Sequence, residues 1–554
     1  MSLPLIPTLL SLAALASEPD LYGMGAENMG RAGASTAIAD DAWAAYYNPA
    51  GLARLKRIRF SFGWVGGQAD LLPFEGIVFD RNGDGSTVDA NGFAEIGSVG
   101  TDYNARATGP RRAFTTDGMQ LGIGYPIGPW LSLGLAAYVP REALLRVQLQ
   151  DPTIPYYVMY RNRNNRFSLH PAIAVQPIPG LSIGLGAQVM AKLKLAAEAS
   201  VGANVSAFSA EDGSSEIEGD VAVQIRKVEA VTPAEIAPVM GLHLTAGTFV
   251  PKWNTELRRV LDQFAVGVTY RGRWGVSTEA NVKAGVHGQV TFDDDTVLLD
   301  ELIAEPIELN ISDIIAYSNP PQVAIGVAGG YSLCDGCAGF RATFDATWTK
   351  WSAFRELLLP ATEISVDAIA GVDLDVKLAD ELPPENFNDT WTVRAGLDTN
   401  IPLLKDPKIG YLALRTRGGY AWVPTPVPDQ TGLTNYVDNS KHIGAVGVGV
   451  EIGQVPHFTK GPVRLDLAVQ LQSLVNRTTV KDPGLVNDAD GDGILSYPAG
   501  YPFSGSYTSG GRTWAMMGTL EADFGNLRPG PPQRKPRADK PDRGSDKKSK
   551  GDAS

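Results

Sequence analysis

The sequence is poor in several residue types that common protein classes need. Its 554 residues include only two cysteines and five histidines. Two cysteines cannot hold a disulfide-stabilised scaffold, and the histidines show no metal-ligand spacing. Neither a G-x-S-x-G elbow nor a phosphate- or dinucleotide-binding fingerprint occurs in a suitable context. We therefore expect no required cofactor and no enzyme activity.

Positive charge and long apolar runs are also scarce. The chain has 48 Lys and Arg against 61 Asp and Glu, a net charge of −13, which argues against a nucleic-acid partner. A long uncharged stretch, Gly118 to Pro140, contains Pro126, Pro129 and several glycines that would break a helix. A mean hydropathy of −0.07 excludes a bundle of transmembrane helices. If the protein crosses a membrane, it does so as a β-barrel.

The N-terminus has the pattern of a secretory signal peptide. Leu3 to Ala16 are mostly apolar and end in Ala14-Leu15-Ala16, a small-x-small cleavage site. We predict a signal peptide over residues 1–16, with Ser17 as the first mature residue. The usual basic start is missing, which leaves open a cytosolic chain with an apolar N-terminal helix. A run of about 14 residues is too short to anchor the chain in a bilayer.

What the sequence has in abundance is a period of two. From Phe340 to Thr349, apolar Phe340, Ala342 and Phe344 alternate with Arg341, Thr343 and Asp345, so one face of the strand is apolar and the other polar. The same alternation recurs over 264–271, 463–472 and 513–524. Because a soluble sandwich also alternates, one strand decides nothing; the number of strands and the lengths of their connections do.

Fourteen such segments predict the fold. They begin near residues 57, 113, 130, 165, 181, 234, 262, 319, 338, 390, 410, 441, 462 and 511. Short turns rich in Pro and Gly alternate with long polar connections at 71–112, 286–318, 353–389 and 476–510, which is typical of outer-membrane barrels. We predict an all-β fold, a transmembrane antiparallel β-barrel of about 14 strands over residues 56–525.

The predicted inward face carries charges of both signs and many glycines. Two interpretations of the charges stay open, a structural ladder of salt bridges across the wall or the lining of a polar conduit. The charges are Arg271, Arg341, Arg394, Arg415, Arg417 and Arg464 with Asp345, Asp398, Asp466, Glu521 and Asp523. The 61 glycines fit a closed sheet, where they allow bends and let an interior element approach the wall.

Residues 17–55 do not fit a strand. Residues 35–47 are rich in alanine and can form a short helix, which Pro49 should end because it pushes Asn48 out of helical geometry. Small side chains allow close packing in a confined space. We therefore predict an N-terminal hatch that plugs the lumen.

Several blocks carry a family resemblance. Gly30-Arg31-Ala32-Gly33-Ala34, Ala39-Asp40-Asp41-Ala42 and Tyr47-Asn48-Pro49-Ala50-Gly51-Leu52 resemble the hatch of the outer-membrane long-chain fatty-acid transporter family, the FadL and TodX group. Three further blocks resemble it in the same order: Trp348 to Phe354, Phe387 to Arg394, and Thr425 to Pro428 followed by Val437 to Ser440. The similarity covers about residues 22 to 525.

The resemblance implies a function. It implies a barrel in the bacterial outer membrane that passively takes up long-chain fatty acids or other hydrophobic compounds, with Asn48, Pro49 and Ala50 as the gating element. Cargo would leave after the hatch shifts or through a gap at a kinked strand, within residues 130–148 or 165–197. The implied surroundings are outer-membrane lipid, lipopolysaccharide and the barrel-assembly machinery, and we expect a monomer. No short motif identifies the substrate pocket.

Two alternatives remain open. One is a structural or adhesive surface barrel, and the other is a barrel hydrolase with a Ser and a His on its wall.

Two acidic loops are candidate calcium sites. Asp80, Asn82 and Asp84, and likewise Asp488, Asp490 and Asp492, place oxygen side chains at every second position before a glycine, as the first half of an EF-hand loop does. Position twelve holds no Glu in either loop, so affinity should be low, and Asx-rich turns are the alternative. Any calcium would be structural.

Two features lie outside these patterns. Cys334 and Cys337 share a short turn, where a disulfide is expected in preference to a redox dithiol or half of a metal site. Residues 526–554 carry nine Lys and Arg against four Asp. We expect a disordered, charged periplasmic tail, with a tether to an anionic envelope partner as the alternative.

Overall fold

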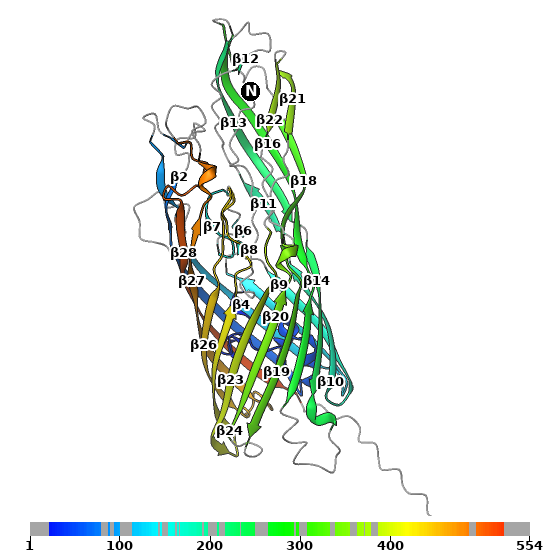
Figure 1. Ribbon diagram of the computed structural model, residues 1–554. Helices are drawn as coiled ribbons and strands as arrows, with labels where there is room; N and C mark the ends of the chain where they lie inside the picture. Colours follow the sequence, from blue (N-terminus) through cyan, green and yellow to red (C-terminus); the bar gives the residue numbers. More distant parts are fainter. Residues whose placement is uncertain are drawn as a thin grey trace, which may run out of the picture.

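The computed structural model forms a closed barrel of fourteen antiparallel strands (Figure 1). It describes residues 21–78, 87–88, 93–99, 114–141, 145–146, 153–160, 163–164, 167–190, 193–197, 208–209, 216–232, 234–249, 264–292, 295–298, 307–332, 338–354, 363–369, 372–377, 386–486 and 495–525. The barrel strands are β1 (Ile58–Leu71), β4 (Phe114–Pro126), β5 (Leu131–Pro140), β9 (Ser168–Ile178), β10 (Leu181–Met190), β14 (Glu235–Thr245), β15 (Ala265–Arg271), β19 (Gln322–Ser332), β20 (Gly339–Thr349), β23 (Thr390–Asp406), β24 (Gly410–Val423), β26 (Lys441–Ile452), β27 (Val463–Val480) and β28 (Ser506–Phe524).

The strands follow one another around the wall, and the last closes on the first. β1 pairs with β28 from Ile58 opposite Phe524 to Leu71 opposite Gly511. Each of the fourteen predicted starts lies within five residues of the observed one, which confirms the predicted barrel. Turns such as 127–130, 179–180 and 407–409 mark one end, called here the short-turn end. The opposite end carries the long connections and is called the long-loop end.

The alternation places apolar side chains outside and polar ones inside. On β27, Leu465, Leu467 and Leu471 are about half exposed, whereas Asp466 and Gln470 are buried. A water-soluble barrel would show the reverse, with apolar residues in its core. An apolar outer face with a polar interior is the pattern of a barrel surrounded by lipid. Within the described residues, no helix is long and apolar enough to cross a bilayer.

The long connections are not simple loops, and this corrects the prediction for them. A sheet formed by β11, β13, β16, β17, β12 and β18 rises beyond the barrel wall at the long-loop end (Figure 1). Segment 307–319, predicted as part of a loop, alternates Ile307, Leu309 and Ile311 with polar residues and therefore pairs as a strand. The additional strands are β2 (Phe74–Val78), β3 (Ile96–Val99), β6 (Leu145–Arg146), β7 (Tyr156–Tyr157), β8 (Arg163–Asn164), β11 (Leu193–Ala197), β12 (Phe208–Ser209), β13 (Glu216–Thr232), β16 (Trp274–Phe292), β17 (Asp295–Leu298), β18 (Ile307–Asn319), β21 (Glu363–Ile369), β22 (Val372–Lys377) and β25 (Tyr436–Val437).

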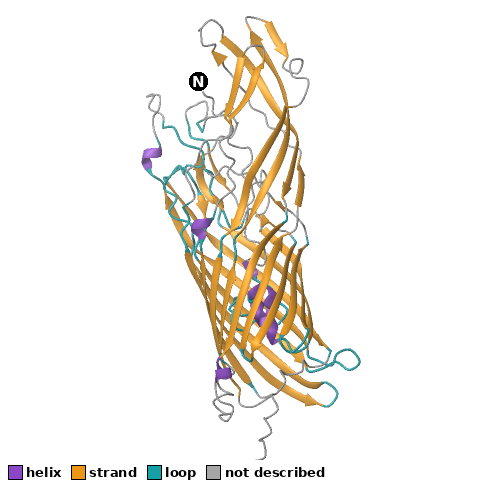
Figure 2. Cartoon of the chain, turned by 90° about the vertical axis from the view of Figure 1, so that its right-hand side faces the viewer, coloured by secondary structure: helices purple, strands orange, loops and turns teal. Residues whose placement is uncertain are grey.

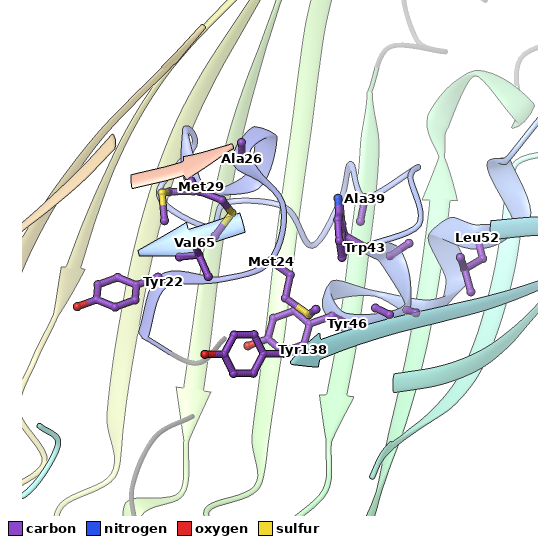
Figure 3. Packing of buried hydrophobic residues seen from close by; sticks show 14 of the residues in the cluster. Tyr22, Met24, Ala26, Met29, Ala39, Trp43, Tyr46, Leu52, Val65 and Tyr138 are labelled. Atoms are coloured by element: carbon purple, nitrogen blue, oxygen red, sulfur yellow. The ribbon is translucent and has the colours of Figure 1, made fainter. Parts of the chain in front are cut away.

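Residues 21–55 lie inside the barrel and are called here the lumen segment (Figure 2). They contain the helices α2 (Ala26–Met29) and α3 (Ala44–Tyr47) and the 3₁₀ helix η1 (Pro49–Arg54). Three further 3₁₀ turns, η2 (Ala246–Phe249), η3 (Trp351–Ala353) and η4 (Pro483–Leu485), lie in connections. Figure 3 shows the core that the lumen segment builds, in which Met24, Trp43 and Tyr46 join Val65 and Tyr138 of the wall.

The wall approaches the lumen segment most closely at glycines, because they have no side chain in the way. A Cβ at Gly184 would lie 2.7 Å from Pro49 Cβ, and one at Gly241 would lie 2.9 Å from the Ala50 nitrogen. Such separations are too short for real carbon atoms. The wall glycines of this kind, called here the glycine belt, are Gly67, Gly122, Gly124, Gly134, Gly184, Gly241, Gly267, Gly326, Gly396 and Gly419. The belt confirms the predicted use of glycine for close approach of an interior element.

We expect Gly184→Ala to destabilise the protein by about 1–3 kcal/mol, because its methyl group collides with Pro49 and Ala50. Gly444→Ala is the matched control, since nothing lies within 4 Å of a Cβ at that strand position. Thermal unfolding of both variants in detergent measures the difference. Equal melting temperatures for the two variants would contradict this account of the belt.

Candidate functional site

Asn48 holds the turn between α3 and η1. It is 1% exposed, and its extended backbone (φ −153°) ends the helix where the sequence predicted. Its side-chain Oδ1 accepts a hydrogen bond from the Ala50 N–H at 3.1 Å. Its Nδ2 donates to the Thr36 carbonyl at 2.8 Å and to the Leu242 carbonyl of β14 at 3.1 Å. One amide therefore ties the turn to the lumen segment and to the wall.

Polar side chains of the wall satisfy backbone N–H groups of the lumen segment. Gln120 Oε1 accepts from the Gly25 N–H at 2.8 Å, and Thr519 Oγ1 accepts from the Ala26 N–H at 2.8 Å. Asp345 Oδ2 accepts from two successive amides, those of Ser35 and Thr36, at 2.9 and 2.8 Å. A buried N–H without a partner costs free energy, so these contacts fix the segment at defined points.

Ion pairs fasten α2 to one side of the wall. Arg31 lies 3.0 Å from Glu27 and 3.2 Å from Asp398, and Glu27 lies 3.4 Å from both Arg415 and Arg417. Burial opposes ionisation, but these guanidinium groups hold the pKa of Glu27 well below its usual value. The ladder continues along the wall through Arg341–Asp398, Arg415–Glu451, Arg417–Asp466, Arg464–Glu451, Arg464–Glu521 and Arg59–Asp523. On this side the salt-bridge interpretation holds.

The remaining inward charges line a cavity instead. A cavity of about 200 Å³ lies between the lumen segment and the long-loop end, with Arg271, Arg394, Lys441 and Asp345 in its wall. The Arg394 guanidinium donates to Thr347 Oγ1 at 2.9 Å, and its cross-strand partner is Asp345. One carboxylate oxygen of Asp345 accepts the hydrogen bonds from the lumen segment described above. Among the described residues, no carboxylate lies at salt-bridge distance from Arg394.

Two other cations of this cavity have aromatic partners. Arg271 lies 4.4 Å over the Tyr46 ring and donates to the Tyr46 carbonyl at 2.9 Å. Lys441 lies 3.6 Å from Asp438 and 5.0 Å over the Tyr160 ring. The cavity wall also contains apolar Leu21, Tyr22, Ala324, Val423 and Ile443. The cavity thus combines positive charge with apolar surface.

A cover of aromatic residues lies at the long-loop end. Strand β7 pairs in parallel with β25, and Tyr156, Tyr160 and Tyr436 are buried there. The Tyr157 hydroxyl donates to the Leu72 or Gly510 carbonyl and accepts from the Gly510 N–H, each at 2.9 Å. Sequence reasoning missed this cover and did not identify Lys441 as a residue of the cavity wall. The only available signal was the block from Val437 to Ser440, which directly precedes Lys441.

The pairing of β9 with β10 is interrupted at one place, called here the weak point. Pairing runs from Gly184 opposite Ala174 to Gly186 opposite Ala172 and resumes only at Val189 opposite Leu169. The interruption falls at Pro171, which has no N–H to donate. On its other side β10 meets a second proline, with Ala187 opposite Pro238. This interruption lies within 165–197, one of the two ranges predicted for a kinked strand.

Ser168 and His170 are the nearest approach to a catalytic pair. Both are buried on β9, with Ser168 Oγ 3.4 Å from His170 Nε2. The His170 ring packs edge-on against Tyr46 at 5.1 Å. Across the described ranges, no carboxylate is found hydrogen-bonded to His170, so the pair lacks the third group that orients a catalytic histidine.

Several predicted sites fall on residues that the structure does not describe. These are the calcium candidates Asp80, Asn82, Asp84, Asp488, Asp490 and Asp492, the pair Cys334 and Cys337, the signal peptide and the tail at 526–554. Within the residues that are described, no group of three His, Cys, Asp or Glu side chains is arranged to hold a metal ion.

Comparison with solved structures finds similar barrels. An FadL homologue of Pseudomonas aeruginosa is 15% identical with a TM-score of 0.49, and the match covers 91% of this chain and 98% of that one. The CymD monoaromatic hydrocarbon channel is 12% identical with a TM-score of 0.42, covering 92% and 100%. The toluene transporter TodX of P. putida is 12% identical with a TM-score of 0.41, also covering 92% and 100%. No curated protein sequence matches the chain.

The family assignment rests on the sequence itself. The predicted resemblance was drawn from short blocks between residues 22 and 525, and a comparison with family models now confirms it. The model of the outer membrane protein transport proteins (OMPP1/FadL/TodX) matches residues 8–452, so this chain belongs to that family of outer-membrane transport proteins.

Proposed function

We propose that this protein takes up long-chain fatty acids passively across the outer membrane. Membership of the transport family supports the general activity. The choice of substrate rests on Arg394, a cation in the cavity between the lumen segment and the long-loop end, called here the upper cavity. No carboxylate lies at salt-bridge distance from Arg394 among the described residues. A neutral hydrocarbon gains nothing from such a group, whereas the carboxylate of a fatty acid pairs with it.

The rest of the cavity supports the same choice. Lys441 and Arg271 add positive charge around Arg394, and Val423 and Ile443 offer apolar surface for the chain. A passive route needs binding that is favourable enough for entry and weak enough for release. A partly neutralised cluster of cations meets both needs, because it attracts the anion without a dedicated cage.

We propose that the lumen segment acts as the hatch, with Asn48, Pro49 and Ala50 as its movable part. These residues contact the wall through one side-chain amide and through close packing on Gly184 and Gly241. The α2 side, in contrast, is held by buried ion pairs. The weak point between β9 and β10 is a candidate for sideways release into the membrane.

The arrangement also supports a proposed orientation. Outer-membrane barrels keep short turns in the periplasm and long loops outside, which puts the short-turn end in the periplasm. Strand β28 ends at Phe524 at that end, so the basic tail that follows is proposed to be periplasmic. We further propose that the protein acts as a monomer among outer-membrane lipid and lipopolysaccharide.

We expect Arg394→Gln to weaken palmitate binding about tenfold, since a hydrogen bond to a charged group is worth roughly 1.5–3 kcal/mol. Binding of hexadecanol, which has the same chain without the charge, should not change. Both are measured on detergent-purified protein, and palmitate uptake is measured in a host without its own transporter.

Arg512→Gln is the control, because its side chain is 71% exposed on β28. If wild-type protein binds palmitate and hexadecanol equally well, carboxylate recognition is wrong and a neutral cargo is favoured. If it speeds the uptake of neither, the transport proposal fails.

We expect Asn48→Ala to loosen the hatch, because it leaves the Thr36 and Leu242 carbonyls and the Ala50 N–H without their partner. The cost is about 1–3 kcal/mol for a buried unsatisfied group. Hydrogen exchange over residues 36–50 should become faster, while Asn400→Ala, on an exposed position of β23, leaves it unchanged. Unchanged exchange in Asn48→Ala would remove Asn48 from the gating element.

A further inference from the structure

Three phenylalanine rings meet on the outer face of the wall at the short-turn end. The ring of Phe60 on β1 lies edge-on to that of Phe524 on β28, with centroids 5.6 Å apart. The ring of Phe458, from the turn between β26 and β27, also lies edge-on to Phe524 at 5.6 Å. Phe458 is 64% exposed and Phe60 is 46% exposed. These three residues, called here the ring cluster, extend the lipid-facing surface to the edge of the barrel.

The turn between β26 and β27 holds two side chains outward. Thr459 is buried, and its Oγ1 accepts from the Val455 N–H at 3.1 Å and donates to the Gly461 carbonyl at 2.9 Å. The Thr459 N–H donates to the Val455 carbonyl at 2.9 Å. Because Thr459 is fixed inside the turn, Phe458 and Lys460 on either side of it are exposed.

The same turn packs against the chain that precedes β1. A Cβ at Gly461 would lie 2.7 Å from Asp523 Cβ and 2.8 Å from Arg57 Cδ, which is too short for real carbon atoms. Glycine at this position therefore lets the turn come beside the start of β1. As a result, Lys56 and Lys460 line one cavity of about 410 Å³ next to the ring cluster.

The two lysines carry positive charge that the described residues do not neutralise. Both are exposed, and among the residues that the structure describes neither Lys56 nor Lys460 has a carboxylate at salt-bridge distance. The neighbouring Arg57 donates to a neutral acceptor, the Gly525 carbonyl. The other basic side chains of the cavity already form ion pairs, which are Arg54–Asp40, Arg59–Asp523, Arg341–Asp398, Arg415–Glu451 and Arg464–Glu451. The lysines are therefore the groups available to a ligand.

The other turns that the structure describes at this end lack the combination of rings and lysines. Turns 127–130 and 179–180 contain no charged residue, although Trp130 is exposed. The turn between β23 and β24 has exposed Lys405 and Lys408, but the exposed apolar residues just before them are leucines. The ring cluster is thus a particular place on the rim rather than one example of a repeated pattern.

We propose that the ring cluster, together with Lys56 and Lys460, is a binding site for an anionic diacyl phospholipid. Its acyl chains would lie against the rings, and its phosphate would lie between the two ammonium groups at the edge of the wall. The long apolar stem of lysine suits this position, because it follows the wall while the ammonium group reaches the headgroups. The lipid would come from the leaflet at the short-turn end, which is the periplasmic leaflet in the orientation proposed above.

The chemistry of the site favours this ligand over two related ones. A free phosphate ion would gain nothing from three exposed rings. A zwitterionic lipid with the same chains would gain less from the lysines, because its own cation accompanies the phosphate. The site lies outside the lumen, so it requires neither a particular cargo nor movement of the lumen segment.

The test measures lipid binding to the detergent-purified full chain by native mass spectrometry. The probes are dioleoyl phosphatidylglycerol, which is anionic, and dioleoyl phosphatidylcholine, which has the same acyl chains and no net charge. The variant is Lys56→Gln/Lys460→Gln, and its matched control is Lys405→Gln/Lys408→Gln, which removes two exposed lysines from the same end. Equal melting temperatures of both variants and wild type verify that the fold is kept.

We expect wild type to bind phosphatidylglycerol about tenfold more tightly than phosphatidylcholine, since each lysine near a membrane surface adds to the attraction of an anionic lipid. The Lys56→Gln/Lys460→Gln variant should lose this preference, and the control should keep it. The absence of a preference in wild type would overturn the proposal. So would an equal loss in both double variants, because general surface charge and not a site would then attract the lipid.

A second pair of variants tests the rings. We expect Phe458→Ser to weaken the binding of both lipids severalfold and to leave their ratio unchanged, because it removes apolar contact and no charge. Phe503→Ser, at a position 52% exposed in the connection before β28, is the control and should bind as wild type does. Unchanged binding by Phe458→Ser would show that the rings are not part of the site. Displacement of phosphatidylglycerol by an equal concentration of inorganic phosphate would show that the lysines bind a free anion, and the lipid site would be wrong.

Discussion

The constraint on which the rest of the structure depends is the width of the closed sheet. About eight strands make a barrel whose inward side chains just fill it, so fourteen strands leave a lumen that the wall side chains alone do not fill. The outward side chains cannot help, because lipid requires them to be apolar and to face away. The lumen segment therefore supplies the core that strands alone do not.

The lumen segment packs small residues against the glycine belt, where its backbone can contact the wall. Bringing a backbone so close also buries its N–H groups, which explains why Gln120, Asp345 and Thr519 point inward from the wall.

The inward charges divide according to what they face. Where α2 meets β23, β24 and β27, acids and bases alternate and neutralise each other, and the desolvation of one ion is offset by its neighbours. Around the upper cavity, Arg394 has no carboxylate at salt-bridge distance among the described residues, and Arg271 and Lys441 lie over aromatic rings. Of the two interpretations that the sequence left open, the salt-bridge ladder is observed on the α2 side, and the polar conduit stays a prediction. The salt-bridge ladder holds the lumen segment, and cations outside the ladder line the upper cavity.

Much of the barrel could be predicted from the sequence, because alternation and turn residues act locally. Phe340, Arg341 and Phe344 reveal their faces without knowledge of any partner strand. The helix end at Asn48 follows from Pro49 alone. The upper cavity could not be predicted, since Arg394, Lys441 and Tyr46 come from β23, β26 and the lumen segment and meet only once the barrel is closed.

The strands within the long connections were missed for a related reason. Segment 307–319 alternates as clearly as a barrel strand, but polar residues and the length of the connection favoured a loop.

The distribution of restraints around the lumen segment indicates which side of it moves. The α2 side is held by buried ion pairs. Breaking one pair would leave a buried charge without its partner, at a cost of several kcal/mol. The η1 side is held by the Asn48 amide, by small side chains and by contact with Gly184 and Gly241. Contacts of this kind separate at lower cost, because water can hydrogen-bond to the released carbonyls once the lumen opens.

A hatch anchored at α2 would swing at η1. That swing would act on the interrupted β9–β10 pairing, because Pro49 and Ala50 pack on Gly184 of β10. Movement of one short turn is thereby coupled to the part of the wall proposed for sideways release.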